Sequence, residues 1–324
     1  MALPDHIRQR LRLPVISAPM FRVSGPELVV AACKAGVIGA FPTANCRSVD
    51  ELDQWLQHMR NALQPSDAPF CPNLIVRREG MREHLECLLR HSVEMVITSV
   101  GSPEAVVGPL HDVGCLVFAD VASLRHAHKA IAAGADGLVL LSSGAGGQTG
   151  WVNGFAFARA VRQFFDGPIV MAGGMSDGHA VWAARALGCD LAYMGTKFIA
   201  THESMAEPGY KQMLVASEFD DVMLSKAFTG LETNMLRPSI VAAGLDPTAI
   251  PASVGEEGAA MLFGSAAADA APKRWKDIWS AGHAVSGVGS VCSVQALVEK
   301  TAQEYEAAQL ASMDSGGLSP RSHG

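Results

Sequence analysis

Through the first 195 residues, short and almost wholly apolar runs alternate with longer amphipathic segments. Strands buried on both faces of a parallel sheet have continuous apolar runs, whereas the helices that cover such a sheet have apolar positions every three or four residues. The pattern therefore predicts a regular alternation of strand and helix. The expected strands are residues 14–18, 37–41, 70–76, 95–99, 115–120, 137–141, 168–172 and 191–195, and the expected helices include residues 26–35, 49–63, 80–91, 123–133, 155–165 and 178–187.

The number of repeated units indicates a closed barrel of the α/β class. Eight strands, each followed by a helix, form the TIM (β/α)8 barrel, which often takes ~250 residues as one domain. The chain has 324 residues, of which 49% are hydrophobic and 18% charged, so it can bury one such core with residues to spare. The sequence therefore predicts a TIM barrel with additional elements.

After the eighth expected strand the β/α pattern stops. Helical stretches such as residues 211–218 follow, and residues 290–308 have the character of a final barrel helix. We expect a barrel formed by residues 1–202 and 286–310, with residues 203–285 as a helical insertion that lies over the barrel mouth as a lid. The polar, Gly- and Ser-rich residues 311–324 are predicted to be a disordered tail.

Charge and cysteine usage narrow the class of protein. The formal net charge is −7 and no block of Lys and Arg occurs, which argues against a nucleic-acid or anionic membrane partner. The seven cysteines are widely spaced, without a C-x-x-C pair, and no apolar segment is long enough for a signal core or a membrane span. We expect a cytoplasmic protein, and the absence of metal-binding motifs predicts no metal site.

Three glycine-rich turns follow three successive late strands, at residues 144–150, 172–174 and 195–196. Glycine lets backbone N–H groups approach an anion closely, and a helix that begins behind the turn adds the positive end of its dipole. In TIM barrels, the loops after the last strands often bind phosphate. The turns therefore predict a phosphorylated ligand at one rim of the barrel.

Other candidate residues lie at the ends of earlier strands. Ala18, Pro19 and Met20 leave room for a flat aromatic ring, although Met20 could instead cap the barrel core. Asn73 is a buried amide whose hydrogen-bond partners could come from a ligand or from the protein. Asp120 could face the ligand, but capping of the following helix is the favoured role because Ser123 and that helix come next.

Two polar side chains are candidates for contact with a substrate. Gln148 lies in the first glycine turn and can orient a substrate, but its amide cannot exchange a proton near neutral pH. His283 follows Trp279 and a glycine in a loop expected to return to the barrel mouth. A structural role for this histidine is the alternative.

Six segments in combination resemble the nitronate monooxygenase family, once called 2-nitropropane dioxygenases. The resemblance covers residues 10 to 305 and is shared with the FMN-dependent enoyl-acyl-carrier-protein reductases. It implies an FMN-binding (β/α)8 barrel with a helical insertion after strand 8. The segments are residues 14–20, 72–73, 145–150, 168–174, 194–198 and 278–282.

The resemblance also implies roles for individual residues. Ala18, Pro19 and Met20 would lie along the flavin ring, and Asn73 would form a hydrogen bond with the cofactor. The remaining cofactor residues would be Asp120, Ala145, Gly146, Gly147 and Ala172, with Gly173, Gly174, Met175, Gly195 and Thr196 at the phosphate.

The chain departs from the family at two positions. Many members have a histidine where this chain has Gln148, and some have a lysine where it has Asp120. Without the histidine, neutral nitroalkanes should be poor substrates, because no adjacent base would remove the α-proton. The expected reaction is oxidation of alkyl nitronates by O₂ through a flavin semiquinone, with Gln148 and His283 as the catalytic residues.

Two other functions are open at this point. One is an NAD(P)H-dependent FMN reductase that acts on an enoyl thioester or a quinone. The other is a flavin-binding protein without turnover, which the loss of the family histidine would favour. A homodimer is also open, because the sequence does not locate the exposed face of the insertion.

Overall fold

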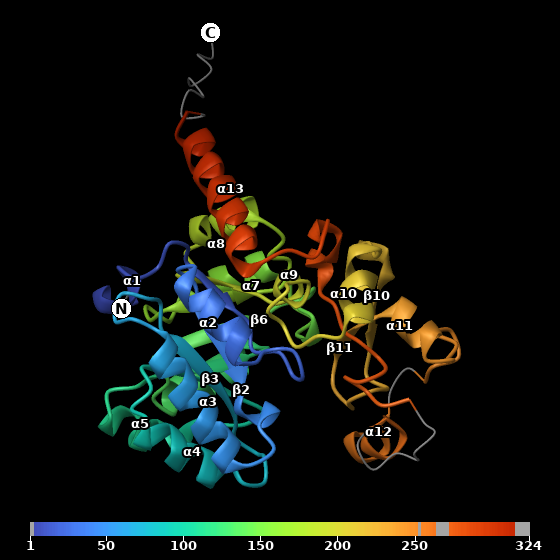
Figure 1. Cartoon of the computed structure of the whole chain (residues 1–324), viewed down its shortest axis with the longest axis horizontal. Coiled ribbons are helices and arrows are strands. Elements are labelled where there is room, and N and C mark those ends of the chain that lie inside the picture. Colours follow the sequence, from blue (N-terminus) through green and yellow to red (C-terminus); the bar gives the residue numbers. More distant parts are fainter. Residues whose placement is uncertain (1–2, 252–253, 264–271, 315–324) are drawn as a thin grey trace.

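Eight parallel strands close into a barrel in the computed structural model, which describes residues 3–251, 254–263 and 272–314 (Figure 1). Each strand pairs with the next along the chain, and β1 closes the ring by pairing with β9. The predicted TIM barrel and all of its expected strands are confirmed. The barrel strands are β1 (Val15–Ser17), β2 (Ile38–Pro42), β3 (Phe70–Ile75), β4 (Met95–Ser99), β5 (Leu116–Val121), β6 (Gly137–Leu141), β8 (Ile169–Ala172) and β9 (Leu191–Met194).

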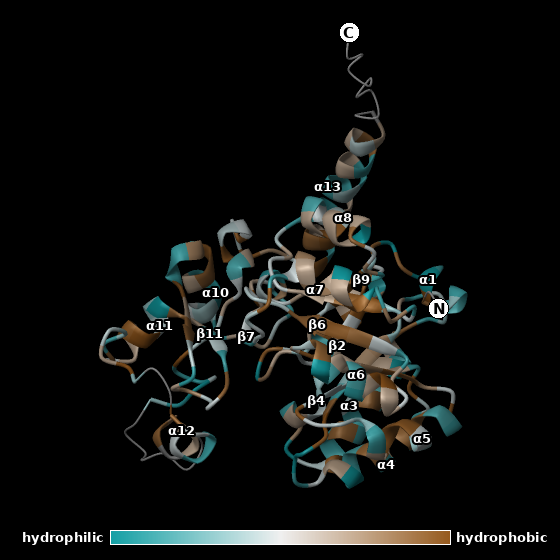
Figure 2. Cartoon of the chain, turned by 180° about the vertical axis from the view of Figure 1, so that it is seen from behind, coloured by the Kyte–Doolittle hydropathy of each residue, from teal (hydrophilic) through white to brown (hydrophobic). Residues whose placement is uncertain are grey.

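Helices surround the barrel in the predicted order, and several begin at a side-chain cap. Ser48, Ser123 and Asp177 each accept a hydrogen bond from a backbone N–H of the first turn that follows. Figure 2 shows brown barrel strands enclosed by helices that are partly teal, as expected of amphipathic covers. The covering helices are α2 (Pro26–Lys34), α3 (Val49–Ala62), α4 (Met81–Arg90), α5 (Glu104–Asp112), α6 (Leu124–Ala132), α7 (Gly154–Val161), α8 (Gly178–Ala186) and α13 (Val294–Asp314), with short helices α1 (Asp5–Arg8) and α9 (Thr196–Ile199).

One covering helix forms from a sequence that locally disfavours a helix. Helix α5 contains Gly108 and Pro109 in its interior, and both residues disfavour a helix. Its buried face, with Val106, Val107 and Leu110, belongs to the same apolar cluster as β5 residue Val117. Tertiary packing therefore outweighs the local preference here.

The barrel interior is filled by side chains rather than open. A buried cluster that includes Ile16, Ile38, Phe118, Val139 and Val170 joins the strands across the barrel. The ring of Phe118 takes the space beside Gly137, where a Cβ atom would lie 2.2 Å from that ring. A ligand can therefore bind only at a rim of the barrel.

The insertion is a mixed α/β subdomain, not the helical one expected. Strands β10 (Val222–Ser225) and β11 (Thr233–Leu236) form an antiparallel sheet with β7 (Gly147–Gln148), which belongs to the loop after β6. Strand β11 pairs with β7 from a distant barrel loop, so the sequence around β11 alone gives little indication that it forms a strand. The helical elements of the insertion are α10 (Pro208–Val215), α11 (Arg237–Ala242) and α12 (Glu256–Phe263).

Helix α13 completes the helical layer after the insertion and is seen beside α8 in Figure 1. Its residues Val294, Leu297 and Val298 pack in one cluster with residues of α2 and β9. Of the tail expected at residues 311–324, residues 311–314 end this helix and the others lie outside the described residues. None of the helices in the described part of the chain has the length and hydropathy of a membrane span.

Replacing Gly178 by alanine tests the α8–α13 contact. A Cβ atom at Gly178 would lie 2.1 Å from the backbone nitrogen of Tyr305, so we expect Gly178→Ala to lower the free energy of unfolding by ~1–3 kcal/mol. Gly108→Ala is the matched control, because its Cβ meets nothing within 4 Å and alanine should add up to ~1 kcal/mol within a helix. Urea unfolding measures both, and equal effects would contradict the packing of α13 described above.

Candidate functional site

A cavity of about 790 Å³ lies at the carboxyl ends of the barrel strands, between the barrel and the insertion. Its lining includes residues of β3, β5, β6, β8 and β9. Residues 273–276 and 279–282, which follow α12, also line it. The volume falls in the range of small-molecule and cofactor sites.

The structure brings almost all of the predicted site residues to this one cavity. Gln148 lies at its edge as an exposed side chain, in the strand β7 that pairs with β11 of the insertion. The assignment of these residues to a cofactor remains a prediction. The predicted cofactor residues in the lining are Ala18, Pro19, Met20, Asn73, Asp120, Ala145, Gly146, Gly147, Ala172, Gly173, Gly174, Met175, Gly195 and Thr196.

His283 is the one predicted site residue that is not in the lining. Its ring packs edge to face against Phe219, with ring centroids 4.5 Å apart, and burial lowers the pKa of the imidazole. Its backbone nitrogen donates a hydrogen bond of 2.9 Å to the Gly144 carbonyl. The geometry thus gives His283 a structural contact, and its contact with substrate remains a prediction.

The glycine turn after β8 has a backbone that other residues rarely adopt. Gly173 and Gly174 have φ angles of 105° and 72°, in the region where L side chains are strained. A Cβ atom on Gly173 would lie 2.6 Å from Ser142 Oγ. Glycine therefore allows this turn to fold closely against the loop after β6.

The insertion is joined to the barrel mouth through a second close approach. A Cβ atom on Gly146 would lie 2.7 Å from the backbone nitrogen of Gly282, and one on Gly282 would lie 2.6 Å from the Gly144 carbonyl oxygen. The Gly282 nitrogen donates a hydrogen bond of 2.9 Å to Thr196 Oγ1, and Asn234 Nδ2 donates one of 2.7 Å to the Ala145 carbonyl. The returning chain is thereby fixed against two of the predicted ligand turns.

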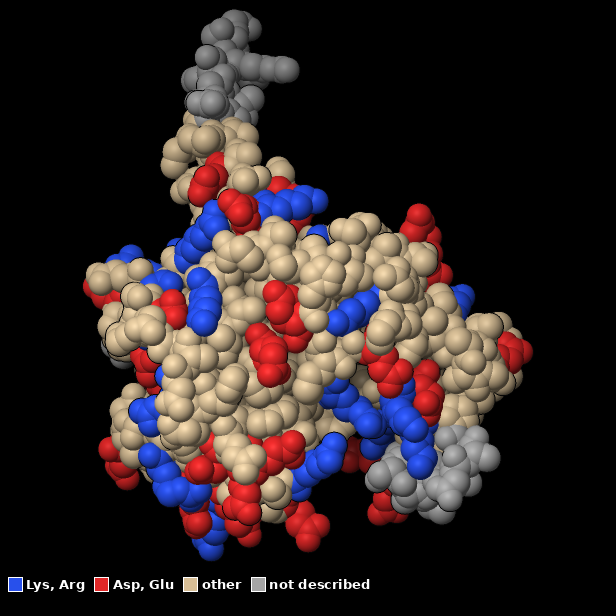
Figure 3. Space-filling model, in the orientation of Figure 1, with Lys and Arg blue, Asp and Glu red and all other residues tan. Residues whose placement is uncertain are grey.

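The insertion also supplies aromatic and basic side chains that were not predicted as site residues. Tyr210 and Trp279 stack with ring centroids 4.9 Å apart, and both line the cavity. Lys273, Arg274 and Lys276 line it from the segment before Trp279, and Figure 3 shows Lys and Arg side chains gathered between the barrel and the insertion. In the sequence, the short segment Lys273-Arg274-Trp275-Lys276 could have indicated this basic part of the lining.

Two polar side chains from the barrel strands lie in the cavity wall. Asn73 Nδ2 donates to the Ile97 carbonyl at 3.3 Å, and Ser99 Oγ donates to Asn73 Oδ1 at 3.2 Å, so protein partners satisfy part of this amide. Asp120 Oδ1 is buried without a hydrogen-bond partner, and burial raises the pKa of its carboxyl to about 7. Ser123, not Asp120, caps α6, so the favoured capping role of Asp120 was wrong.

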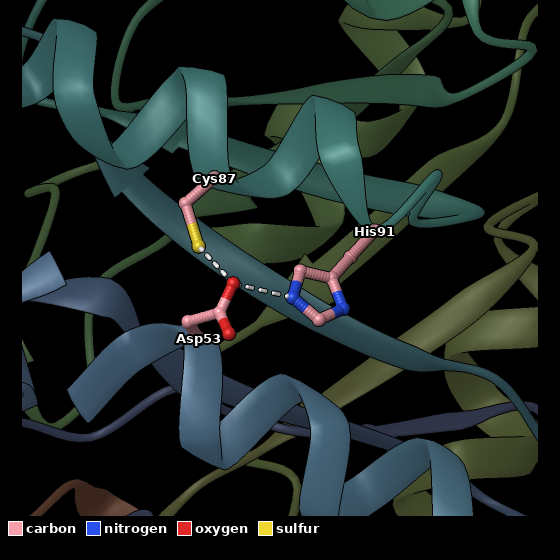
Figure 4. Close-up of side chains that lie close together, drawn as sticks. All are labelled: Asp53, Cys87 and His91. Atoms are coloured by element: carbon pink, nitrogen blue, oxygen red, sulfur yellow. Dashed lines mark hydrogen bonds and ion pairs between the residues drawn. The ribbon is translucent and has the colours of Figure 1, made fainter. Parts of the chain in front are cut away.

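A separate group of potential ligand atoms lies outside the barrel (Figure 4). Asp53 on α3 accepts hydrogen bonds from His91 Nε2 at 2.9 Å and from Cys87 Sγ at 3.8 Å, and Arg90 Nη2 lies 3.4 Å from the same oxygen. A metal needs a deprotonated thiol, but burial raises the pKa of Cys87 to about 11, and the Arg90 cation already faces Asp53. We interpret the group as a set of side-chain hydrogen bonds that holds α3 against α4.

The chain is similar to a known protein family and to several characterised proteins. Residues 75–304 match the family model described as nitronate monooxygenase. A curated nitronate monooxygenase from Paraburkholderia phytofirmans is 26% identical over 282 residues, which cover 72% of this chain and 76% of that protein. The solved nitroalkane oxidase from Streptomyces ansochromogenes is 25% identical, covers 95% of this chain and 99% of its own, and superimposes with a TM-score of 0.79.

A further relative is named as a dehydrogenase rather than as a monooxygenase or an oxidase. It is the (3aS,4S,5R,7aS)-5-hydroxy-7a-methyl-1-oxo-octahydro-1H-indene-4-carboxyl-CoA dehydrogenase from Rhodococcus jostii, which is 28% identical over 228 residues. The match covers 70% of this chain but only 64% of that relative, so less than two thirds of the relative is represented.

Proposed function

The chain belongs to the nitronate monooxygenase family, and from this premise we propose that it is an FMN-dependent oxidoreductase that oxidises alkyl nitronates with O₂. The observation that carries the proposal is the single cavity that gathers three glycine turns and the end of β1. This arrangement suits a ligand with a phosphate at one end and a flat ring at the other.

The residues present fit FMN in chemistry as well as in position. Gly173, Gly174, Gly195 and Thr196 would hold the phosphate, because the glycines expose backbone N–H groups and Thr196 adds a hydroxyl. Ala18, Pro19 and Met20 would face the ring from the end of β1. The buried Asp120 Oδ1, which lacks a partner in the protein, indicates that a polar ligand group belongs beside it. Bound FMN would supply the redox chemistry, by one-electron exchange with the nitronate and reaction with O₂.

Gln148 would orient the substrate rather than deprotonate it. Its amide is exposed at the edge of the cavity and has no proton to exchange near neutral pH. A preformed nitronate is an anion and needs no base, and the basic residues Lys273 and Lys276 at the cavity favour an anion. We therefore propose nitronates, rather than neutral nitroalkanes, as the substrates.

A specific observation also favours a second candidate function, the NAD(P)H-dependent reduction of an enoyl thioester. The segment with Lys273, Arg274 and Lys276 would lie near the phosphates of a long carrier that enters the cavity from the insertion side. The indene-carboxyl-CoA dehydrogenase among the relatives has a CoA thioester in its name. The nitronate function ranks first because the matched family model covers most of the chain.

Anaerobic stopped-flow absorbance distinguishes the two functions. The FMN-loaded protein is mixed separately with propane nitronate, NADH and NADPH, and the flavin band is followed. We expect a rapid change with the nitronate and none with the nicotinamides. Rapid two-electron bleaching by NADH or NADPH, with no response to the nitronate, would establish the reductase instead.

Gln148→His tests the role of the amide. A histidine at this edge of the cavity could remove the α-proton, so we expect kcat/KM for neutral nitroalkanes to rise by up to about 100-fold. The value for the nitronate should not rise, because its proton is already gone. Gln148→Asn is the matched control and should leave the nitroalkane value low. Equal kinetics of the unsubstituted protein on nitroalkane and nitronate would contradict the proposal that it lacks a base.

A further inference from the structure

The carboxyl of Asp120 is an exception among the polar groups of the barrel. Among the described residues, Asp120 Oδ1 and Ser17 Oγ are the buried side-chain atoms without a hydrogen-bond partner, and only Asp120 lines the cavity. A buried polar atom without a partner is destabilising, so its presence calls for an explanation. A ligand that bonds to Asp120 would supply the missing partner.

The surroundings of Asp120 favour its neutral form. Its neighbours in the sheet, Thr98 near it on β4 and Val139 on β6, carry no charge. Tyr193 on β9 and Cys71 on β3 interact with it, and burial raises the pKa of both well above the usual values, which favours their neutral forms. Among the described residues, burial is the one cause that raises the pKa of this carboxyl, and no cation lowers it.

We propose that Asp120 binds the cofactor as a neutral acid, donating its proton in a hydrogen bond to an acceptor on the polar edge of the flavin, so that cofactor binding is linked to proton uptake. This inference rests on the proposed FMN site and adds a protonation state and a pH dependence to one of its predicted residues. Asn73 lies in the same wall and keeps an unbonded amide hydrogen, so a donor pair faces the ligand. An ionised Asp120 would offer acceptors only, so it could not donate a hydrogen bond to the acceptor atoms of that edge.

The proposed hydrogen bond predicts in which direction, and by how much, the affinity for FMN changes with pH. The carboxyl loses its proton as the pH rises through about 7, and only the protonated fraction of the protein would be competent to bind. The apparent Kd for FMN should therefore be about 25-fold weaker at pH 8.5 than at pH 6.5. The FMN phosphate ionises near pH 6, but this affects every variant equally.

The experiment is a titration of the flavin-free protein with FMN, followed by flavin fluorescence from pH 6.5 to pH 8.5. Asp120→Asn keeps the shape of the side chain and an N–H donor. The affinity of this variant for FMN should therefore not fall 25-fold between pH 6.5 and pH 8.5. Asp112→Asn, which changes an exposed carboxylate at the end of α5, is the matched control and should retain the fall. Parallel pH profiles for Asp120→Asn and the unsubstituted protein would overturn the inference.

A second measurement, made without any flavin, separates this inference from the proposed function. An aspartate whose pKa is raised on folding contributes stability that is present at low pH and lost as the pH rises from about 4 to about 7. The gain in unfolding free energy from Asp120→Asn should grow over that window and then stay constant. A gain that does not vary with pH would overturn the neutral-acid assignment. Failure of every variant to bind FMN, with the pH-dependent gain intact, would instead reject the FMN site and with it the proposed hydrogen bond.

Discussion

The close contact between two backbones at the barrel mouth determines the arrangement of the whole candidate site. The loop after β6 and the chain that returns from the insertion approach so closely at Gly146 and Gly282 that neither position has space for a Cβ atom. Hydrogen bonds from Gly282 to Thr196 and from Asn234 to Ala145 hold the same contact. The insertion is therefore fixed over the ends of β6 and β9, and a cavity is formed where an isolated barrel would present an open rim.

This arrangement divides the chemistry of the cavity between two parts of the chain. The barrel contributes glycine turns, an apolar strand end and the carboxyl of Asp120, all of which suit a cofactor that stays bound. The insertion contributes the stacked Tyr210 and Trp279 and a basic segment, which suit recognition of an anionic substrate. The barrel side of the cavity thus suits the cofactor, and the insertion side suits the substrate.

The sequence was sufficient to predict the barrel and the part of the cavity lining that the barrel turns supply, because both depend on local patterns. Apolar runs mark the strands, and glycines mark turns at the ends of strands that must meet at one rim. It was insufficient where the outcome depends on distant partners: β11 forms against β7, and the His283 ring packs on Phe219 outside the cavity lining. The basic residues at 273–276 were visible in the sequence, but only the fold shows that they lie beside the glycine turns.

The central claim is that the glycine turns after β8 and β9 bind the phosphate of a flavin. The most direct measurement compares the affinity of the flavin-free protein for FMN and for riboflavin, which differ only in that phosphate, by calorimetric titration at pH 7. Two charge-assisted hydrogen bonds to the phosphate predict that FMN binds at least about 100-fold more tightly than riboflavin. Equal affinities for the two flavins, or no binding of either, would contradict the account.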